Sequence, residues 1–328
     1  MIELAYCQDL FATYRTVESA LLALEAGDTL RLKGQLLMER YRIEEMLGES
    51  DLSSVFRAID TRLDRPVAIK VLSPTLGQNA TRRLLDKARQ MARLQTSNIV
   101  TIFDWYEDQG LAYLVMEYLH GKTLRNLMSK GDDFRPLDVA VDILYALEYA
   151  HSRDAVNGNL KPENVMISNE VKLIDFGLWW AEDGQKLTEL PFMLGDVYYL
   201  SPEQILGEKV DARTDLYAFG VILYEMFTKR KPFLGDVRCV LEKHIYQKPI
   251  PPRQINPNIS RSLEHLILKL LSKDPSHRYE TVGQVRRILL GLEAVPDSKI
   301  KASSPLTRPP FDRDVKPGLP VGGARRQG

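Results

Sequence analysis

The chain has 328 residues, which is enough for one large domain in two lobes or for two small domains. Its 44 basic and 44 acidic residues balance, which argues against a general nucleic-acid or membrane-surface binder. Two cysteines provide neither a disulfide framework nor a zinc site, and no apolar run approaches the ~18–20 residues that span a bilayer. We therefore expect a cytoplasmic protein with no membrane span and no nucleic-acid partner.

Residues 1–37 are predicted to form an N-terminal extension built on one amphipathic helix. Apolar side chains recur there at three- and four-residue steps from Leu4 to Leu24, and Gly27 follows as a stop signal. Such a helix either packs on the main domain or binds a partner.

From about Tyr41 the sequence is predicted to be rich in β-strands. Apolar runs, separated by Gly, Asp and Pro signals, occupy residues 40–50, 53–60, 66–72, 99–108 and 111–119. One helical pattern, over residues 82–94, interrupts these strands.

After Gly121 the helical period dominates. Helices are predicted over residues 138–152, 215–227, 262–272 and 282–294, and a short strand pair is predicted at 164–168 and 171–175. A strand-rich first part and a helix-rich second part predict an α+β fold of two lobes with a cleft between them.

Residues 294–328 change in composition, because they are rich in Pro, Gly and Arg and poor in large apolar side chains. This composition predicts a disordered basic tail, which either stays solvated or carries a docking motif. The expected organisation is therefore an extension over 1–37, a main domain over 38–293 and a tail over 294–328. Within the main domain, we expect one lobe over 38–119 and the other over 120–293.

Three short motifs in the main domain point to phosphate chemistry. V-A-I-K ends an apolar strand at Lys70, K-P-E-N occupies 161–164, and D-F-G begins at Asp175 after a second apolar strand. The carboxylate of Asp175 and the amide oxygen of Asn164 are hard ligands that suit Mg²⁺, and lysines suit phosphate groups.

The order and spacing of these motifs resemble the protein kinase family. Ser201-Pro202-Glu203 stands in the place of A-P-E, while TDLYAFG (with Asp215 and Gly220) and DPSHRY (with Arg278) match later kinase segments. Over roughly residues 41–293, the chain is most similar to bacterial eukaryotic-like Ser/Thr protein kinases. This resemblance implies a bilobal protein kinase-like fold, with a β-rich N-lobe carrying one main helix and a helical C-lobe. It also implies ATP and Mg²⁺ as cofactors and a protein substrate or partner.

The resemblance further implies roles for individual residues. Lys70 would hold the α- and β-phosphates, and Lys161 would neutralise charge on the γ-phosphoryl group. Asn164 and Asp175 would bind Mg²⁺, unless Lys70 and Asp175 form only a structural ion pair in a kinase-like cleft. The other implied cofactor-binding positions are Leu47, Gly48, Val55, Ala68, Met166 and the hinge from Glu117 to Leu119.

Two loops depart from the family pattern. The Gly-rich loop G-x-G-x-x-G-x-V reads GESDLSSV over residues 48–55, so Ser50 and Ser53 replace glycines that allow close backbone approach. Asp51 adds negative charge where phosphates would lie, and we therefore expect weak nucleotide binding. The H-R-D motif reads Asn157-Gly158-Asn159, which puts Asn159 at the catalytic Asp position, and an amide cannot act as a base.

The helix over residues 82–94 also departs from the family, because Lys87 stands where a glutamate normally pairs with the strand lysine. Lys70 would then face Lys87, and two like charges ~4 Å apart cost up to ~4 kcal/mol at an effective dielectric of about 20. Asp86 lies ~100° around the helix and could pair with Lys70 only if the helix rotates.

Asp196 adds a carboxylate at a position where the family has a threonine that contacts the catalytic Asp and Lys. Either this is a coincidence, or Asp196 pairs with Lys161 or acts as a substitute base for the one that is missing at Asn159.

These features predict a Ser/Thr protein kinase-like domain that is a catalytically weak or inactive pseudokinase, which binds ATP-Mg weakly and acts as a regulatory or scaffolding module. A missing base alone removes ~10²–10⁴ of rate, but a degraded phosphate loop and a lost ion pair also impair positioning. The alternative is an active atypical Ser/Thr protein kinase that transfers the ATP γ-phosphate to protein Ser/Thr hydroxyls.

Overall fold

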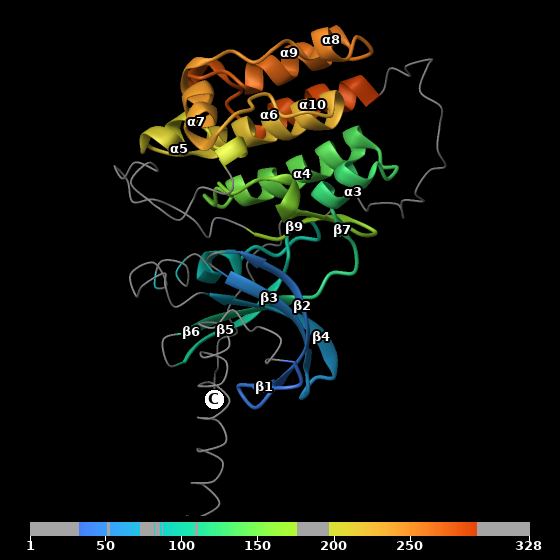
Figure 1. The fold of residues 1–328 in the computed structure, drawn as a ribbon, viewed down its shortest axis with the longest axis vertical. Helices are drawn as coiled ribbons and strands as arrows, with labels where there is room; N and C mark the ends of the chain where they lie inside the picture. The colour runs from blue at the N-terminus through green and yellow to red at the C-terminus, as the bar shows by residue number, and fades with distance from the viewer. Residues whose placement is uncertain are drawn as a thin grey trace, which may run out of the picture. The chain divides into compact units, whose positions relative to one another are not determined.

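The computed structural model describes residues 33–50, 53–72, 82, 86, 88–108, 111–175 and 197–293. All of the described residues belong to a single compact unit. The predicted N-terminal helix and the predicted basic tail therefore lie outside the described residues. Figure 1 shows the strands of the first half of the chain on one side of this unit and the helices of the second half on the other.

The N-lobe is a six-stranded antiparallel sheet with the strand order β1-β2-β3-β4-β6-β5. The strands are β1 (Leu36–Leu37), β2 (Tyr41–Ser50), β3 (Ser53–Asp60), β4 (Arg65–Leu72), β5 (Ile102–Asp108) and β6 (Leu111–Glu117). β4 lies inside the sheet, and every residue from Val67 to Leu72 is buried, which explains its continuous apolar run. Helical residues follow at Arg82, Asp86 and 88–91.

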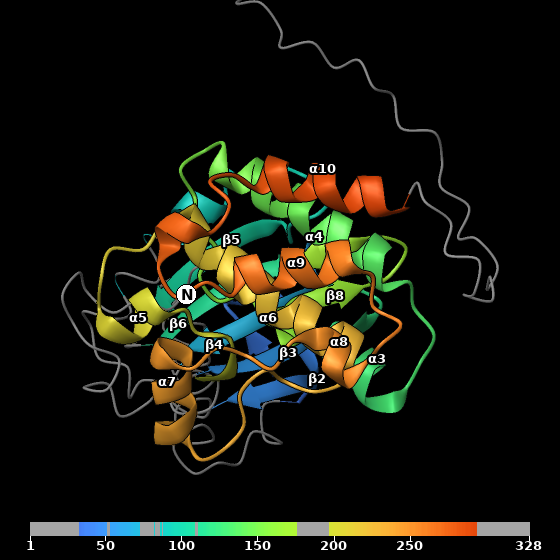
Figure 2. The same ribbon diagram turned by 90° about the horizontal axis from the view of Figure 1, so that it is seen from above.

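The C-lobe is built from helices, and α6 is its central element. The helices are α3 (Leu124–Lys130), α4 (Pro136–His151), α5 (Pro202–Leu206), α6 (Ala212–Thr228), α7 (Val237–Tyr246), α8 (Pro252–Ile255), α9 (Arg261–Leu270) and α10 (Val282–Glu293). Short 3-10 turns occur at η3 (Pro162–Asn164), η5 (Val197–Tyr199) and η6 (Pro275–His277). α6 is buried almost all round and lies among α4, α8 and α9, as Figure 2 shows from above. A helix that is apolar on every side is expected at the centre of a core.

A small three-stranded sheet joins the two lobes. It has the order β7-β8-β9, from β7 (Lys122–Thr123), β8 (Val165–Ile167) and β9 (Val171–Leu173). The amide of Val100, in the N-lobe, donates to the carbonyl of Leu173 at 2.9 Å, and Leu173 in turn donates to the carbonyl of Asn98 at 2.9 Å. These bonds fix the end of β9, and therefore Asp175, against the N-lobe.

The predicted strands and the four predicted long helices of the C-lobe are confirmed, together with the short strand pair. The sequence analysis did not predict α3, α5 and α8, which are short, or α7, in which only Val240 and His244 are buried. Of the helices that the structure describes, none is long and apolar enough to cross a membrane.

Candidate active site

The site is organised around an ion pair between the two lobes. Lys70 lies on β4, and Asp175 follows β9 by two residues. The Lys70 ammonium donates to both carboxylate oxygens of Asp175, at 3.1 and 3.0 Å. Their side chains are 8% and 15% exposed, so this pair is largely removed from water. The two residues that the sequence assigned to phosphate and metal therefore meet.

Asn159 contacts the same carboxylate from the loop over residues 157–164, which we call the catalytic loop. Its Nδ2 donates to Oδ2 of Asp175 at 3.3 Å, a contact that a carboxylate at position 159 could not make. The loop holds Asn159 in place, because its amide donates to Oδ1 of Asn157 at 3.0 Å and its carbonyl accepts from Nδ2 of Asn164 at 2.8 Å. The amide that replaces an acid at position 159 is thus hydrogen-bonded to Asp175, while the backbone of Asn159 is hydrogen-bonded to Asn157 and Asn164.

Asp215, at the N-terminal end of α6, holds this loop in place through hydrogen bonds to its backbone. Its carboxylate accepts from the amides of Asn157 at 2.8 Å and Gly158 at 2.6 Å, and it contacts Nε2 of His151 at 2.7 Å. Gly158 has φ 63°, a left-handed conformation that glycine adopts without strain, and its carbonyl accepts from the Gln204 side chain at 2.9 Å. Gly158, which stands where the family has an arginine, therefore suits the left-handed backbone conformation at this position.

Three of the positions implied for nucleotide binding share one face of the N-lobe sheet. Val55 on β3 is the cross-strand partner of Lys70, and Ala68 precedes Lys70 by two residues on β4. Since side chains alternate along a strand, Val55, Ala68 and Lys70 point to the same side. Gly48 pairs with Val55 in the neighbouring strand, while the Leu47 side chain is exposed.

A second ion pair crosses between the lobes beside the hinge. Glu117, the last residue of β6, accepts from the Lys172 ammonium of β9 at 2.8 Å through both carboxylate oxygens. Met166 lies on β8 opposite Lys172, and Leu119 packs half-buried against the main core. The sequence analysis assigned Glu117 to the hinge but had no signal for its pairing with Lys172.

Several predicted features fall outside the described residues, namely Asp51, Lys87, the D-F-G residues 176–177 and Asp196. Asp86 is described, and its carboxylate pairs with Arg89 at 2.7 Å on the exposed surface. Lys70 therefore pairs with Asp175 rather than with Asp86.

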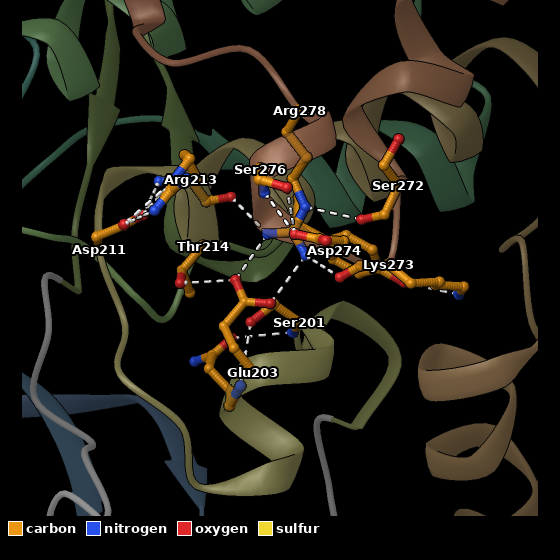
Figure 3. Close-up of polar contacts among 12 residues, drawn as sticks. Ser201, Glu203, Asp211, Arg213, Thr214, Ser272, Lys273, Asp274, Ser276 and Arg278 are labelled. Carbon is orange, nitrogen blue, oxygen red and sulfur yellow. Dashed lines mark hydrogen bonds and ion pairs between the residues drawn. The ribbon is translucent and has the colours of Figure 1, made fainter.

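A buried ion pair, shown in Figure 3, joins Glu203 of α5 to Arg278, the residue that follows η6. Arg278 donates to both oxygens of Glu203, at 2.7 and 2.8 Å, and the two side chains are 0% and 2% exposed. The carbonyls of Ser272, Lys273 and Arg213 accept the remaining guanidinium hydrogens. Two residues that the sequence places in separate motifs therefore form one buried ion pair.

A network below the catalytic loop was missed by sequence reasoning. Arg125 of α3 donates to Glu163 at 2.6 Å and to Glu225 of α6 at 2.8 Å, and it also contacts the Tyr199 hydroxyl. Tyr199 donates to Glu225 at 2.5 Å, and burial, reinforced by the Glu225 carboxylate, raises the pKa of Tyr199. The paired residues lie 26 to 100 positions apart along the chain, and no local sequence pattern predicts that they meet.

Asp175 and Asn164 alone supply too few oxygen ligands for a tightly held Mg²⁺, so such an ion would need substrate phosphates and water to complete its coordination. This ion requires near-octahedral oxygen coordination. Asp175 is the carboxylate at the metal position, and both of its oxygens already contact the Lys70 ammonium. Asn164 uses its Nδ2 within the loop, which leaves its amide oxygen as a ligand. Across the part of the chain that the structure describes, no cluster of three or more His, Cys, Asp or Glu side chains is arranged to hold a metal ion.

Comparison with known proteins places this fold and site in one family. The protein kinase domain family matches residues 41–287, and the chain belongs to it. A probable serine/threonine-protein kinase of Clostridium perfringens is 36% identical over 293 residues, which are 87% of this chain and 43% of that protein. The serine/threonine-protein kinase PknB of Mycobacterium tuberculosis is 37% identical over 268 residues, which are 77% of this chain and 43% of that protein.

The solved structures agree at the level of the fold. The kinase domain of Mycobacterium tuberculosis PknI superposes with a TM-score of 0.64 at 22% identity, and the match covers 79% of this chain and 98% of that one. The curated relatives are longer, since the match covers about two fifths of their length. This chain therefore contains a Ser/Thr protein kinase domain, and its family generally uses ATP, Mg²⁺ and protein substrates.

Proposed function

We propose that this kinase domain is catalytically weak or inactive, that it binds ATP weakly, and that it acts as a regulatory or scaffolding module for a protein partner. The observation that carries the proposal is the contact from Asn159 to Asp175, because the group at the base position donates a hydrogen bond instead of accepting a proton. The balanced charge of the chain supports a protein partner rather than a nucleic acid, and its two cysteines support a cytoplasmic location.

The size of the catalytic loss follows from what the site lacks. Loss of the general base alone removes about 10²–10⁴ of rate and would leave transfer that can be measured. Positioning contributes more to phosphoryl transfer, and it suffers from Ser50 and Ser53 in the phosphate loop and from Lys87 on the helix. Since these losses affect one reaction step together, their effects do not simply add.

An active but atypical Ser/Thr kinase is the second candidate. Lys70, Lys161, Asn164 and Asp175 are all retained, and the relatives are named as serine/threonine-protein kinases. In this alternative, Asp196 would supply the carboxylate that is missing at 159.

Incorporation of labelled γ-phosphate separates the two candidates. The purified chain is incubated with ATP and a generic basic protein substrate, beside the Asp175→Ala variant. We expect no label above the level of that variant. Clear transfer by the unmodified chain, abolished in Asp175→Ala, would establish the active kinase and reject the proposal.

A thermal-shift titration tests nucleotide binding separately from catalysis. A ligand at about 100 times its Kd stabilises a protein by about 2.7 kcal/mol, so a weak binder raises the melting temperature only at millimolar concentration. We expect such a shift with ATP and Mg²⁺ at several millimolar, a range that follows from the same relation. No shift under these conditions would remove nucleotide binding from the proposal.

A further inference from the structure

A groove on the surface of the C-lobe lies between α9 and α10, which are neighbours in the fold (Figure 2). It has a volume of about 530 Å³ and is lined by Lys269, Tyr279, Gln284, Arg287 and Ile288. Lys269 belongs to α9, and the last three residues lie three and four positions apart on one side of α10. These residues are distinct from those of the candidate active site, so the groove is a separate feature of the C-lobe.

The floor of the groove is apolar. Tyr279 and Ile288 are partly buried and pack against the main hydrophobic core. The Lys269 ammonium lies 4.3 Å from the centroid of the Tyr279 ring, which is within the range of a cation–π contact. The groove therefore combines a fixed aromatic ring, an aliphatic side chain and a cation held beside them.

The rim of the groove is cationic. Among the residues that the structure describes, no carboxylate pairs with Lys269 or Arg287, and Glu280, the acidic residue next to Tyr279, is exposed and joined to neither cation. Arg287 donates through Nε to the carbonyl of Gly283 at 3.2 Å, which leaves its two terminal amino groups for another partner. An apolar floor between such cations fits an acidic, amphipathic ligand.

The N-terminal segment over residues 1–32 has this composition. Its apolar side chains recur at helical steps, and its charged residues are Glu3, Asp9, Glu18, Glu25 and Asp28 against Arg15 and Arg31. The tail over 295–328 has more basic than acidic residues, so its charge has the same sign as that of the groove. Of the two ends of the chain, the N-terminal segment is therefore the complementary one.

The predicted N-terminal helix presents its acids beside apolar side chains. Tyr14, Glu18, Leu21 and Glu25 follow one another at steps of four, three and four residues, which places them along one side of a helix. The two carboxylates are then about 10 Å apart along the axis with Leu21 between them. Asp9 precedes Glu18 by nine residues and lies about 180° around the helix. A helix that binds in a groove through anchors at such steps is a common mode of recognition.

We propose that the groove between α9 and α10 binds residues 1–32 of a second copy of this chain, with Glu18 and Glu25 paired to Lys269 and Arg287. Figure 1 shows β1, the first strand after the segment, at the end of the unit opposite α9 and α10, which favours the groove of another copy. Because the segment and the groove are different surfaces, the association is head-to-tail. It depends neither on nucleotide binding nor on phosphate transfer, and so its test is separate from that of the proposed function.

Sedimentation equilibrium of the full chain at low ionic strength tests the proposal, because salt screens exposed charge pairs. We expect self-association with a Kd of about 1–100 µM, a weak contact on the scale of protein affinities. Glu18→Gln with Glu25→Gln should raise this Kd by about tenfold or more, and so should Lys269→Met with Arg287→Met. Asp9→Asn removes the same charge from the opposite side of the predicted helix and should change the Kd by less than about twofold.

Charge reversal provides a stricter test that the segment of one copy meets the groove of another. One chain carries Lys269→Glu and Arg287→Glu, and a second chain carries Glu18→Lys and Glu25→Lys. Each should remain monomeric alone, because its groove and its segment then have the same charge. An equimolar mixture should associate, since the groove of each chain is complementary to the segment of the other.

Three results would overturn the inference. An unmodified chain that stays monomeric up to about 100 µM shows that the contact does not form. Association that is unchanged in the Lys269→Met and Arg287→Met chain places the contact on another surface. A mixture of the two reversed chains that stays monomeric shows that segment and groove do not meet between copies. Each of these results leaves the proposed function standing, because none of them measures nucleotide binding or phosphate transfer.

Discussion

At position 159, a side-chain amide stands where the family has a catalytic acid. Asn159 donates to Asp175 and lies in a loop that Asp215 holds through two backbone amides. The backbone that would present a catalytic acid is therefore formed, while the acid itself is missing. This combination makes the proposed loss of activity testable by substitution, because the loop does not need to be rebuilt.

The first prediction concerns Asn159 and Asp196. Asn159→Asp should raise phosphoryl transfer, since a general base is worth about 10²–10⁴. If Asp196 already supplies a carboxylate, the gain should be small, because two acids at one site favour protonation of one of them. Combined with Asp196→Thr, the substitution restores the family's arrangement and should give the fastest variant of the set.

We expect even this double variant to remain slow, because Lys87, Ser50 and Ser53 still disturb the positioning of the phosphates. The measurement is the initial rate of γ-phosphate transfer for the two single variants and the double variant. Turnover in the range of about 1–100 s⁻¹, which is usual for kinases, would contradict this expectation and place the whole defect in the catalytic loop.

The second prediction concerns the buried pair of Arg278 and Glu203. Arg278→Ala strands the Glu203 carboxylate, which is 2% exposed, and should lower the free energy of unfolding by about 3–5 kcal/mol. Arg238→Ala is the matched control, because Arg238 pairs with Glu242 while 90% exposed and should contribute at most about 1 kcal/mol. Denaturant unfolding measures both. Equal stabilities for the two variants would show that the pair in Figure 3 contributes little.

Short motifs identified the residues of two ion pairs, and local conformation and long-range contacts limited what else could be predicted. Lys70, Asp175, Glu203 and Arg278 were identified because each belongs to a short pattern with a fixed order. The pairing of Glu117 with Lys172 was not identified, because its partners are 55 residues apart and no motif links them. The left-handed φ of Gly158 was also missed, since sequence shows a glycine but not its backbone conformation.

At the scale of elements, the helices with long apolar patterns were predicted, while the short helices and α7 were not. α6 and α9 carry strong apolar patterns, whereas α8 has four residues and too few positions to show a period. What the sequence does not show is how closely two helices approach. Gly220 of α6 lies where a Cβ atom would be 2.7 Å from the Cβ of Leu270, at the end of α9.

The third prediction compares two helical glycines. In Gly220→Ala the backbone of α9 must shift, and this overpacking should lower the free energy of unfolding by about 1–3 kcal/mol. The higher helix propensity of alanine offsets up to about 1 kcal/mol of that loss. Gly291→Ala on α10 meets no atom within 4 Å and should stabilise by up to about 1 kcal/mol. Thermal unfolding of both variants gives the comparison, and a stabilising Gly220→Ala would show that α6 and α9 are less closely packed than described.

At the scale of the whole molecule, the C-lobe buries titratable groups that link its stability to pH. His244 of α7 is fully buried and lies 2.9 Å from the Tyr217 hydroxyl of α6. Lys273 covers the end of α7 by donating to the carbonyls of Lys243 and His244, at 3.0 and 2.6 Å, with its ammonium 4.4 Å from the Phe233 ring centroid. Burial and the nearby Arg278 charge lower the pKa of Lys273 to about 7.

The fourth prediction follows from His244. Burial, together with the Lys273 charge, lowers the pKa of His244 from 6.5 to about 3. Between these two values the unfolded chain binds one proton more than the folded chain, so the free energy of unfolding falls as the pH falls. The contribution of this residue to the slope is at most about 1.4 kcal/mol per pH unit. The loss of stability begins as the pH falls through 6.5 and is complete only below about pH 3.

His244→Gln isolates this contribution, because a glutamine does not titrate and its amide oxygen can still accept from the Tyr217 hydroxyl. Denaturant unfolding between about pH 4 and 6, inside the window that the two pKa values define, should show a flatter slope for this variant than for the unmodified chain. His265→Gln on α9 is the exposed control and should keep the full slope. Parallel slopes for the unmodified chain and His244→Gln would show that His244 accepts a proton as readily in the folded C-lobe as in the unfolded chain. In that case, the packing of α7 against α6 would not be the source of acid sensitivity.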